Sequence, residues 1–133
     1  MSKHLMSENV YTPAGGIMIA GSCLQTVFPE AFEKLTAMVD EVYELCLEET
    51  HVNMAVTKIA AILGTGQVTH MIFASVDRSP HCTQMHYIMH EIERTLKEHI
   101  PVEHYVISEG KLICVSEKAI DLSKSLARLT QMI

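Results

Sequence analysis

An apolar run near the middle of the chain, followed at once by a helix-start motif, most constrains the fold. The run spans residues 71–76, in which only Ser75 is polar, and it belongs to a predicted strand over residues 68–76. A strand that is apolar on both faces is usually central in a parallel or mixed sheet. Residues 77–79 then lead to Pro80, which opens a long helical pattern. The sequence therefore predicts a buried strand, a short connection and a helix within an α/β domain.

The start of this helix is the best candidate for a binding site. Ser79 and Pro80 are favoured at the N-cap and at the first helical position. His81 and Cys82 follow in the first turn, where free backbone N–H groups and the helix dipole favour negative charge. Open α/β sheets bind ligands beyond the carboxyl ends of their strands. We therefore expect a small anionic molecule to bind here, with these ligand-binding residues: Asp77, Arg78, Ser79, His81, Cys82 and, as a neighbour, Cys23.

Cys82 is also a candidate catalytic residue. A thiolate at a helix N-terminus is a nucleophile when a base lies close to it. His70 or His104, on neighbouring strands, can supply that base, and Asp77 can orient it. The simpler alternative is that the turn is only a well-capped strand-to-helix connection and that Cys82 is a small packed residue. The sequence alone leaves open whether the chain is an enzyme.

A second hypothesis, a redox or metal-handling protein, rests on the histidines of the same helix. His86 and His90 lie one helical turn apart, and Cys82 lies one turn before them. This spacing suits a transition metal such as zinc. The opposing interpretation is that these histidines are solvated or lie in an interface. A third hypothesis is an interaction subunit of a larger assembly, without a catalytic site of its own.

The remaining elements follow from hydrophobic periodicity and turn residues. Residues 1–10 are expected to be a mobile tail, and residues 11–133 a single α/β domain. Cys46 and Cys114 lie within apolar patterns and are expected in the core. The expected elements are a short strand over 17–20, helices over 29–48 and 51–63, the strand 68–76, the helix 80–98, strands over 102–108 and 112–115, and a last helix with the stripe Ala119, Leu122, Leu126 and Leu129.

The resulting fold prediction is a small α/β sandwich with the order (β)ααβαββα. It has a mixed sheet of three or four strands and about four helices. The right-handed crossover rule makes strands 68–76 and 102–108 a parallel pair, and the following hairpin adds an antiparallel edge. If strand 17–20 lies parallel to strand 68–76 and beside it, Cys23 and Cys82 emerge at the same edge of the sheet.

Composition narrows the function classes. The chain of 133 residues has a formal net charge of −6 and no cluster of Lys and Arg, which argues against a nucleic-acid partner. No stretch has the length of a membrane span, and no secretory signal is evident, so a cytoplasmic location is expected. The four cysteines form no Cys-x-x-Cys pair and are expected as reduced thiols. Helix 51–63 carries Lys58 as its only full charge, so much of its surface is apolar. Abundant apolar helix surface in a domain with few strands predicts a homo-oligomer.

Overall fold

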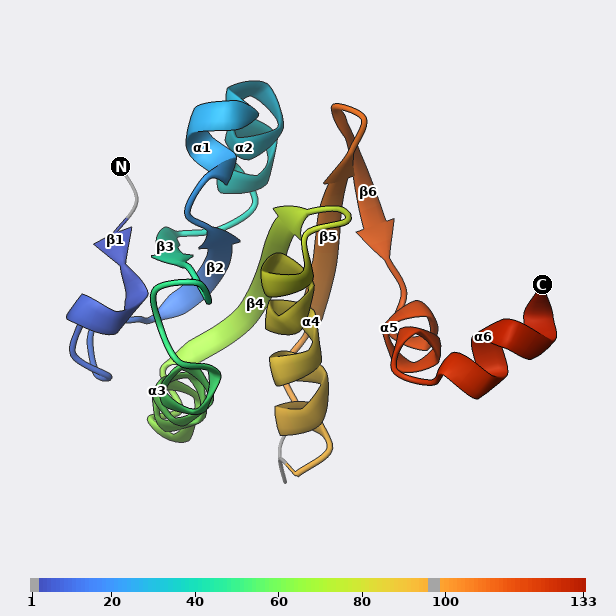
Figure 1. Ribbon diagram of the computed structural model, residues 1–133. Helices are drawn as coiled ribbons and strands as arrows, with labels where there is room; N and C mark the ends of the chain where they lie inside the picture. Colours follow the sequence, from blue (N-terminus) through green and yellow to red (C-terminus); the bar gives the residue numbers. More distant parts are fainter. Residues whose placement is uncertain (1–2, 96–98) are drawn as a thin grey trace.

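A single six-stranded sheet organises the computed structural model, which describes residues 3–95 and 99–133 (Figure 1). The strand order is β1-β3-β2-β4-β5-β6. The first five strands in this order run parallel to their neighbours, and β6 runs antiparallel to β5. The strands span Lys3–His4 (β1), Gly15–Gly21 (β2), Glu41–Leu45 (β3), Val68–Val76 (β4), Val102–Ser108 (β5) and Lys111–Val115 (β6).

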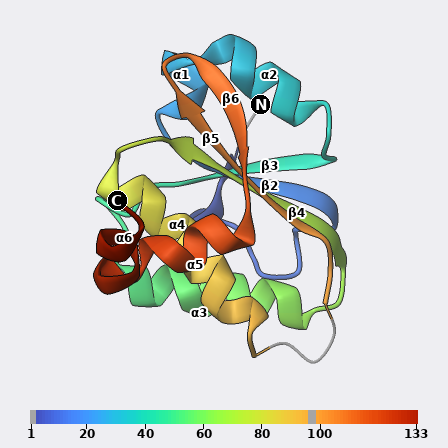
Figure 2. The same cartoon turned by 90° about the vertical axis from the view of Figure 1, so that its right-hand side faces the viewer.

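Helices cover both faces of this sheet, which gives three layers (Figure 2). One face carries α1 (Leu24–Val27) and α2 (Pro29–Thr36), and the other carries α3 (Val52–Gly64) and α4 (Pro80–Glu93). A 3₁₀ turn, η1 (Leu5–Ser7), follows β1. The chain ends with α5 (Glu117–Ser123) beside α4, and α6 (Leu126–Met132).

The central strands β2 and β4 are buried on both faces because helices cover both sides of the sheet. The side chains of a strand point alternately to its two sides, so each strand contributes to both hydrophobic clusters. Ile17 and Ile19 of β2 pack towards α3 and α4, whereas Met18 and Ala20 pack towards α1 and α2. Each large aliphatic side chain buried in this way contributes about 1.5–3 kcal/mol. The apolar pattern of residues 71–76, in which only Ser75 is polar, therefore indicates a strand covered by helices on both sides.

The α/β class and three expected pairings are confirmed. β4 pairs in parallel with β5, β5 and β6 form the antiparallel hairpin, and β2 lies parallel to β4 and beside it. The predicted numbers of elements were too small. In the described part of the chain the sheet has six strands and is covered or flanked by six α-helices.

The prediction of one long helix over residues 29–48 was wrong. α2 ends at Thr36, and residues 41–45 form strand β3 between β1 and β2. Val39, Val42 and Cys46 happen to continue the helical spacing of α2. The alternative pattern is a strand whose Tyr43 and Leu45 are fully buried, and pairing with two neighbouring strands favours it.

Three further boundaries differ from the prediction. Residues 3–7 are not a free tail, because Lys3–His4 pairs with β3 and Leu5 is fully buried; residues 1–2 lie outside the described residues. The helix predicted to reach residue 98 is described as far as Glu93, and residues 96–98 again lie outside. The last helix is divided, because Ser125 caps α6 separately from α5. No described helix has both the length and the apolar character needed to cross a bilayer.

Candidate functional site

The candidate site lies where the strand order reverses. From β2 the chain crosses to β3 on one side, and from β4 it crosses to β5 on the other side. The connections that leave the carboxyl ends of β2 and β4 therefore diverge and leave a crevice between them. Ligands of open α/β sheets bind in such a crevice.

A pocket of about 180 Å³ occupies this position. It brings together three cysteines that are far apart in the sequence. Cys23 follows β2, Cys46 follows β3, and Cys82 lies in the first turn of α4, after β4. We call this the thiol pocket. Its lining residues are Gly21, Ser22, Cys23, Leu45, Cys46, Leu47, Glu48, Ser79, His81, Cys82 and Met85.

The turn from β4 into α4 fixes Cys82 as the sequence predicted. Ser79 is the N-cap, and its hydroxyl oxygen accepts a hydrogen bond from the backbone N–H of Cys82 at 3.4 Å. Pro80 occupies the first helical position. Arg78 adopts a left-handed conformation with φ of 68°, uncommon for residues other than glycine, and this reverses the chain. Cys82 is thereby held as the third residue of α4.

Gly21 gives the Cys82 thiol its space at the end of β2. A Cβ atom added at Gly21 would lie 3.4 Å from Cys82 Sγ. A larger branched side chain at this position would extend into the space of the thiol and of the pocket. The absence of a side chain at Gly21 therefore allows Cys82 to lie against the end of the neighbouring strand.

Cys23 and Cys82 are neighbours in the thiol pocket. Burial raises the pKa of the Cys23 thiol, and the electrostatic effect of the neighbouring Cys82 raises it further. Cys46 adds a smaller effect in the same direction. The expectation that these two cysteines emerge at one edge of the sheet is thus met by the geometry. Cys23 is exposed to solvent and Cys82 is partly buried.

The other predicted ligand-binding residues divide into two groups. Ser79 and His81 line the thiol pocket, and His81 Nδ1 lies 3.3 Å from a carboxylate oxygen of Glu48. Asp77 and Arg78 are exposed and do not line it. The pocket therefore carries a carboxylate at its edge, and the guanidinium expected to hold an anion lies outside its lining.

Sequence reasoning missed Cys46, Glu48 and Ser22. The first two were assigned to a helix, so their position at the end of a parallel strand was not anticipated. The alternation of Tyr43 and Leu45 was the signal that could have revealed it. The Ser22 hydroxyl oxygen is buried and has no hydrogen-bond partner among the described residues. Cys114, which was expected in the core, is exposed on β6.

The histidines proposed as bases for Cys82 lie elsewhere. The imidazole of His70 occupies the space above Gly16, at the amino end of β2, and its Nε2 lies 3.3 Å from the carbonyl oxygen of Met38. His104 is buried, and its Nδ1 lies 2.8 Å from Nδ1 of His86. Neither histidine lines the thiol pocket, and Asp77 orients neither of them in the structure.

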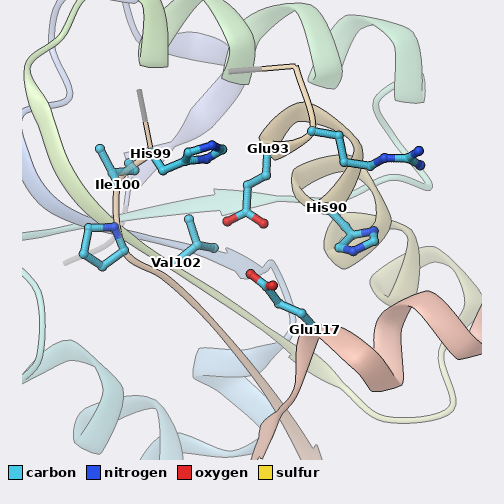
Figure 3. Close-up of a pocket in the computed structure, with 8 residues that line it drawn as sticks. His90, Glu93, His99, Ile100, Val102 and Glu117 are labelled. Carbon is cyan, nitrogen blue, oxygen red and sulfur yellow. The ribbon is translucent and has the colours of Figure 1, made fainter. Parts of the chain in front are cut away.

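The predicted metal ligands are not brought together. His86 Nε2 lies 2.6 Å from the Ser75 hydroxyl oxygen, so both ring nitrogens of His86 have partners inside the core. His90 instead lines a second pocket, of about 440 Å³, between α4 and α5 (Figure 3). Within residues 3–95 and 99–133, no group of three or more His, Cys, Asp or Glu side chains lies in positions to hold a metal ion.

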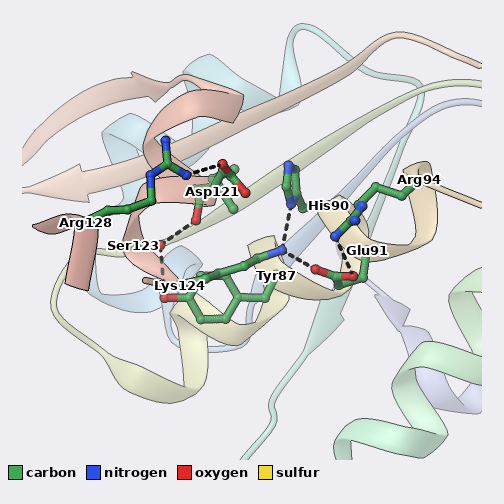
Figure 4. A network of polar contacts seen from close by, with 9 residues as sticks. Tyr87, His90, Glu91, Arg94, Asp121, Ser123, Lys124 and Arg128 are labelled. Atoms are coloured by element: carbon green, nitrogen blue, oxygen red, sulfur yellow. Dashed lines mark hydrogen bonds and ion pairs between the residues drawn. The ribbon is translucent and has the colours of Figure 1, made fainter. Parts of the chain in front are cut away.

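Polar contacts at this second pocket join α5 to α4. Lys124 donates to His90 Nδ1 at 2.7 Å and forms an ion pair with Glu91 (Figure 4). In Figure 3 the carboxyl groups of Glu93 and Glu117 face one another. Partial burial, the charge of Glu117 and a hydrogen bond to Glu117 together raise the pKa of Glu93 to about 7. The pair is therefore expected to share a proton near neutral pH.

Comparison with known proteins supports the architecture. Residues 13–132 match the family described as a Rossmann-like domain. The chain belongs to this family. No curated protein and no solved structure matches it. In this Rossmann-like domain the thiol pocket occupies the crevice at which open α/β sheets bind their ligands.

Proposed function

We propose that this Rossmann-like domain binds a small molecule in the thiol pocket, and that Cys82 is the side chain that contacts or reacts with it. The convergence of Cys23, Cys46 and Cys82, which follow three different parallel strands, is the observation that carries this proposal. Loops that meet at the carboxyl ends of parallel strands commonly bind ligands on a rigid scaffold.

The volume of the pocket limits the size of the ligand. At about 30 Å³ for each water molecule, 180 Å³ holds about six waters. Pockets for drug-sized ligands are typically about 300–1,000 Å³. Neither Gly15-Gly16 nor Gly64-Thr65-Gly66 matches a nucleotide-binding motif, and Gly15-Gly16 lies at the opposite end of β2. These features favour a compact ligand over a dinucleotide.

Saturable alkylation tests the proposal. Iodoacetamide is small enough to enter the pocket, and its reaction with each cysteine can be followed by peptide mass spectrometry. We expect the rate at Cys82 to saturate with reagent concentration, because binding precedes reaction. The rate at the exposed Cys114 should rise linearly and serves as the internal control. A linear rate at all four cysteines would contradict a binding pocket.

Three variants sharpen this test. Gly21→Val fills the pocket beside Cys82 and should abolish saturation, whereas Gly64→Ala, where an added Cβ meets no atom within 4 Å, should preserve it. Arg78→Ala tests the anionic character of the ligand. If the ligand is an anion held by Arg78, inorganic phosphate should slow the alkylation of Cys82 in the natural sequence and lose this effect in Arg78→Ala.

A further inference from the structure

We propose that Cys23 and Cys82 form a reversible redox pair that exchanges with low-molecular-weight disulfides. This inference rests on the proposed function, since it concerns the same pocket, and it names the substrate class: a small organic disulfide. The two thiols follow the adjacent parallel strands β2 and β4 and line one solvent-connected pocket as neighbours.

The backbone holds the two thiols in place from both sides. Cys23 is the N-terminal flanking residue of α1, and its carbonyl oxygen accepts a hydrogen bond from the backbone N–H of Val27 at 3.0 Å. Cys82 is fixed by the Ser79 cap and lies over Gly21. Neither thiol belongs to a free loop, so their contact is a property of the folded protein.

The surroundings of the two thiols differ, which assigns them different roles. Cys82 lies in the first turn of a 14-residue helix, where backbone N–H groups favour negative charge on a nearby side chain. Burial and the neighbouring Cys82 raise the pKa of Cys23, which disfavours a thiolate at Cys23. Cys82 is therefore the attacking residue and Cys23 the resolving residue.

The chemistry balances in two steps. The Cys82 thiolate attacks one sulfur of a disulfide RSSR, which forms a Cys82–S–SR mixed disulfide and releases RS⁻. Cys23 then attacks Cys82 Sγ, loses its proton and releases the second thiol. The disulfide gains two electrons and two protons and becomes two RSH molecules, while Cys23 and Cys82 are oxidised to one disulfide. An excess of RSH reverses both steps.

Cys46 is the natural competitor for Cys23, because it lines the same pocket. Cys46 follows β3, which lies on the side of β2 away from β4, and it raises the pKa of Cys23 less than Cys82 does. The bond is therefore assigned to Cys23 and Cys82. This bond would join the loop after β2 to the start of α4 and would close the pocket between them.

The test uses 2-hydroxyethyl disulfide, a disulfide small enough for the pocket, on the fully reduced chain, with intact mass and peptide mapping as readouts. We expect loss of two hydrogens and a Cys23–Cys82 cross-linked peptide, formed at least about tenfold faster than the 2-mercaptoethanol adduct on Cys114. An excess of 2-mercaptoethanol should restore both thiols. Cys23→Ser should stop at a mixed disulfide on Cys82, and Cys114→Ser, outside the pocket, should behave as the natural sequence does.

Adducts that form on all four cysteines at similar rates, or a bond that joins Cys46 to either partner in place of Cys23–Cys82, would overturn the redox assignment. Circular dichroism of each reduced variant establishes that it is folded. The two proposals fail separately. If the Cys23–Cys82 bond forms but alkylation does not saturate, only the proposed ligand binding is contradicted. If alkylation saturates but the bond does not form, only the proposed redox pair is contradicted.

Discussion

At the scale of single residues, the buried histidines have the clearest energetic consequence. His104 is only 1% exposed, packs against Phe73 and leaves its Nε2 without a partner among the described residues. Burial lowers the pKa of His86 to about 4 and that of His104, with a smaller effect from His86, to about 3. Both rings are therefore neutral at neutral pH, and one Nδ1 donates to the other.

Acid should destabilise the protein through these two residues. Unfolded histidine binds a proton below about pH 6.5, whereas the folded state resists protonation until about pH 4, so stability is lost as the pH falls through this range. Between pH 6.5 and pH 5, each histidine is expected to cost about 2 kcal/mol. Urea unfolding at pH 7.5 and pH 5 measures this loss.

His104→Phe keeps a ring against Phe73 and removes one of the two titrating groups. It should reduce the acid-dependent loss by about half. His51→Asn changes an exposed histidine and is the matched control, with the acid dependence of the natural sequence. An acid dependence that His104→Phe leaves unaltered would show that other groups cause it.

At the scale of elements, the Ser79 cap should matter more than a chemically similar cap elsewhere. Ser79→Ala removes the acceptor of the Cys82 N–H and should lower the free energy of unfolding by about 1 kcal/mol. Ser125 makes the same kind of bond, to the N–H of Arg128, but α6 has no buried residue. Ser125→Ala should therefore leave global unfolding by urea unaltered. Equal losses in the two variants would contradict the central position of α4.

The carboxyl pair between α4 and α5 has the opposite pH dependence to the histidines. Unfolded Glu93 ionises near pH 4.5, and the folded group ionises only near pH 7, so ionisation removes stability as the pH rises between these values. Glu93→Gln should be more stable than the natural sequence at pH 8, by about 1 kcal/mol after solvent screening, and nearly equal to it at pH 4. Glu91→Gln, which loses the ion pair with Lys124, should show no gain at pH 8.

The sequence predicted those elements whose local signals agree with their tertiary environment. The bounds of two strands and the start of α4 were located to the residue. An apolar run marks strand 68–76, Pro101 and the Glu109-Gly110 turn flank strand 102–108, and a Ser-Pro cap marks α4. β3 was missed, because its five residues form a strand through pairing with two neighbours that the local pattern does not reveal. Because β3 was not predicted, Cys46 and Glu48 were not assigned to the site. Cys23 was found by a conditional argument from topology.

At the scale of the whole molecule, two apolar surfaces are uncovered in the single chain. One is a groove of about 500 Å³ between α3 and α4, lined mainly by Val52, Val56, Ala60, Ile88 and Ile92. The other is the stripe of α6, in which Leu126 is 79% and Met132 66% exposed. Met54 of α3, the helix whose single charge predicted a homo-oligomer, is 53% exposed in the single chain. The apolar groove of one copy can bind the apolar helix of a second copy, and this contact would bury both surfaces.

We therefore expect the chain to self-associate, with α6 of one copy in the α3–α4 groove of the other. Sedimentation over a range of concentrations should give twice the mass of the chain. Leu126→Glu on α6 and Ala60→Glu in the groove should each shift the equilibrium towards the single chain, because either buries a charge in the contact. Gln131→Glu makes a similar change on the opposite side of α6 and should leave the mass unaltered. A natural sequence that sediments as a single chain would exclude this assembly, and dissociation by Leu126→Glu alone would place α6 against another surface.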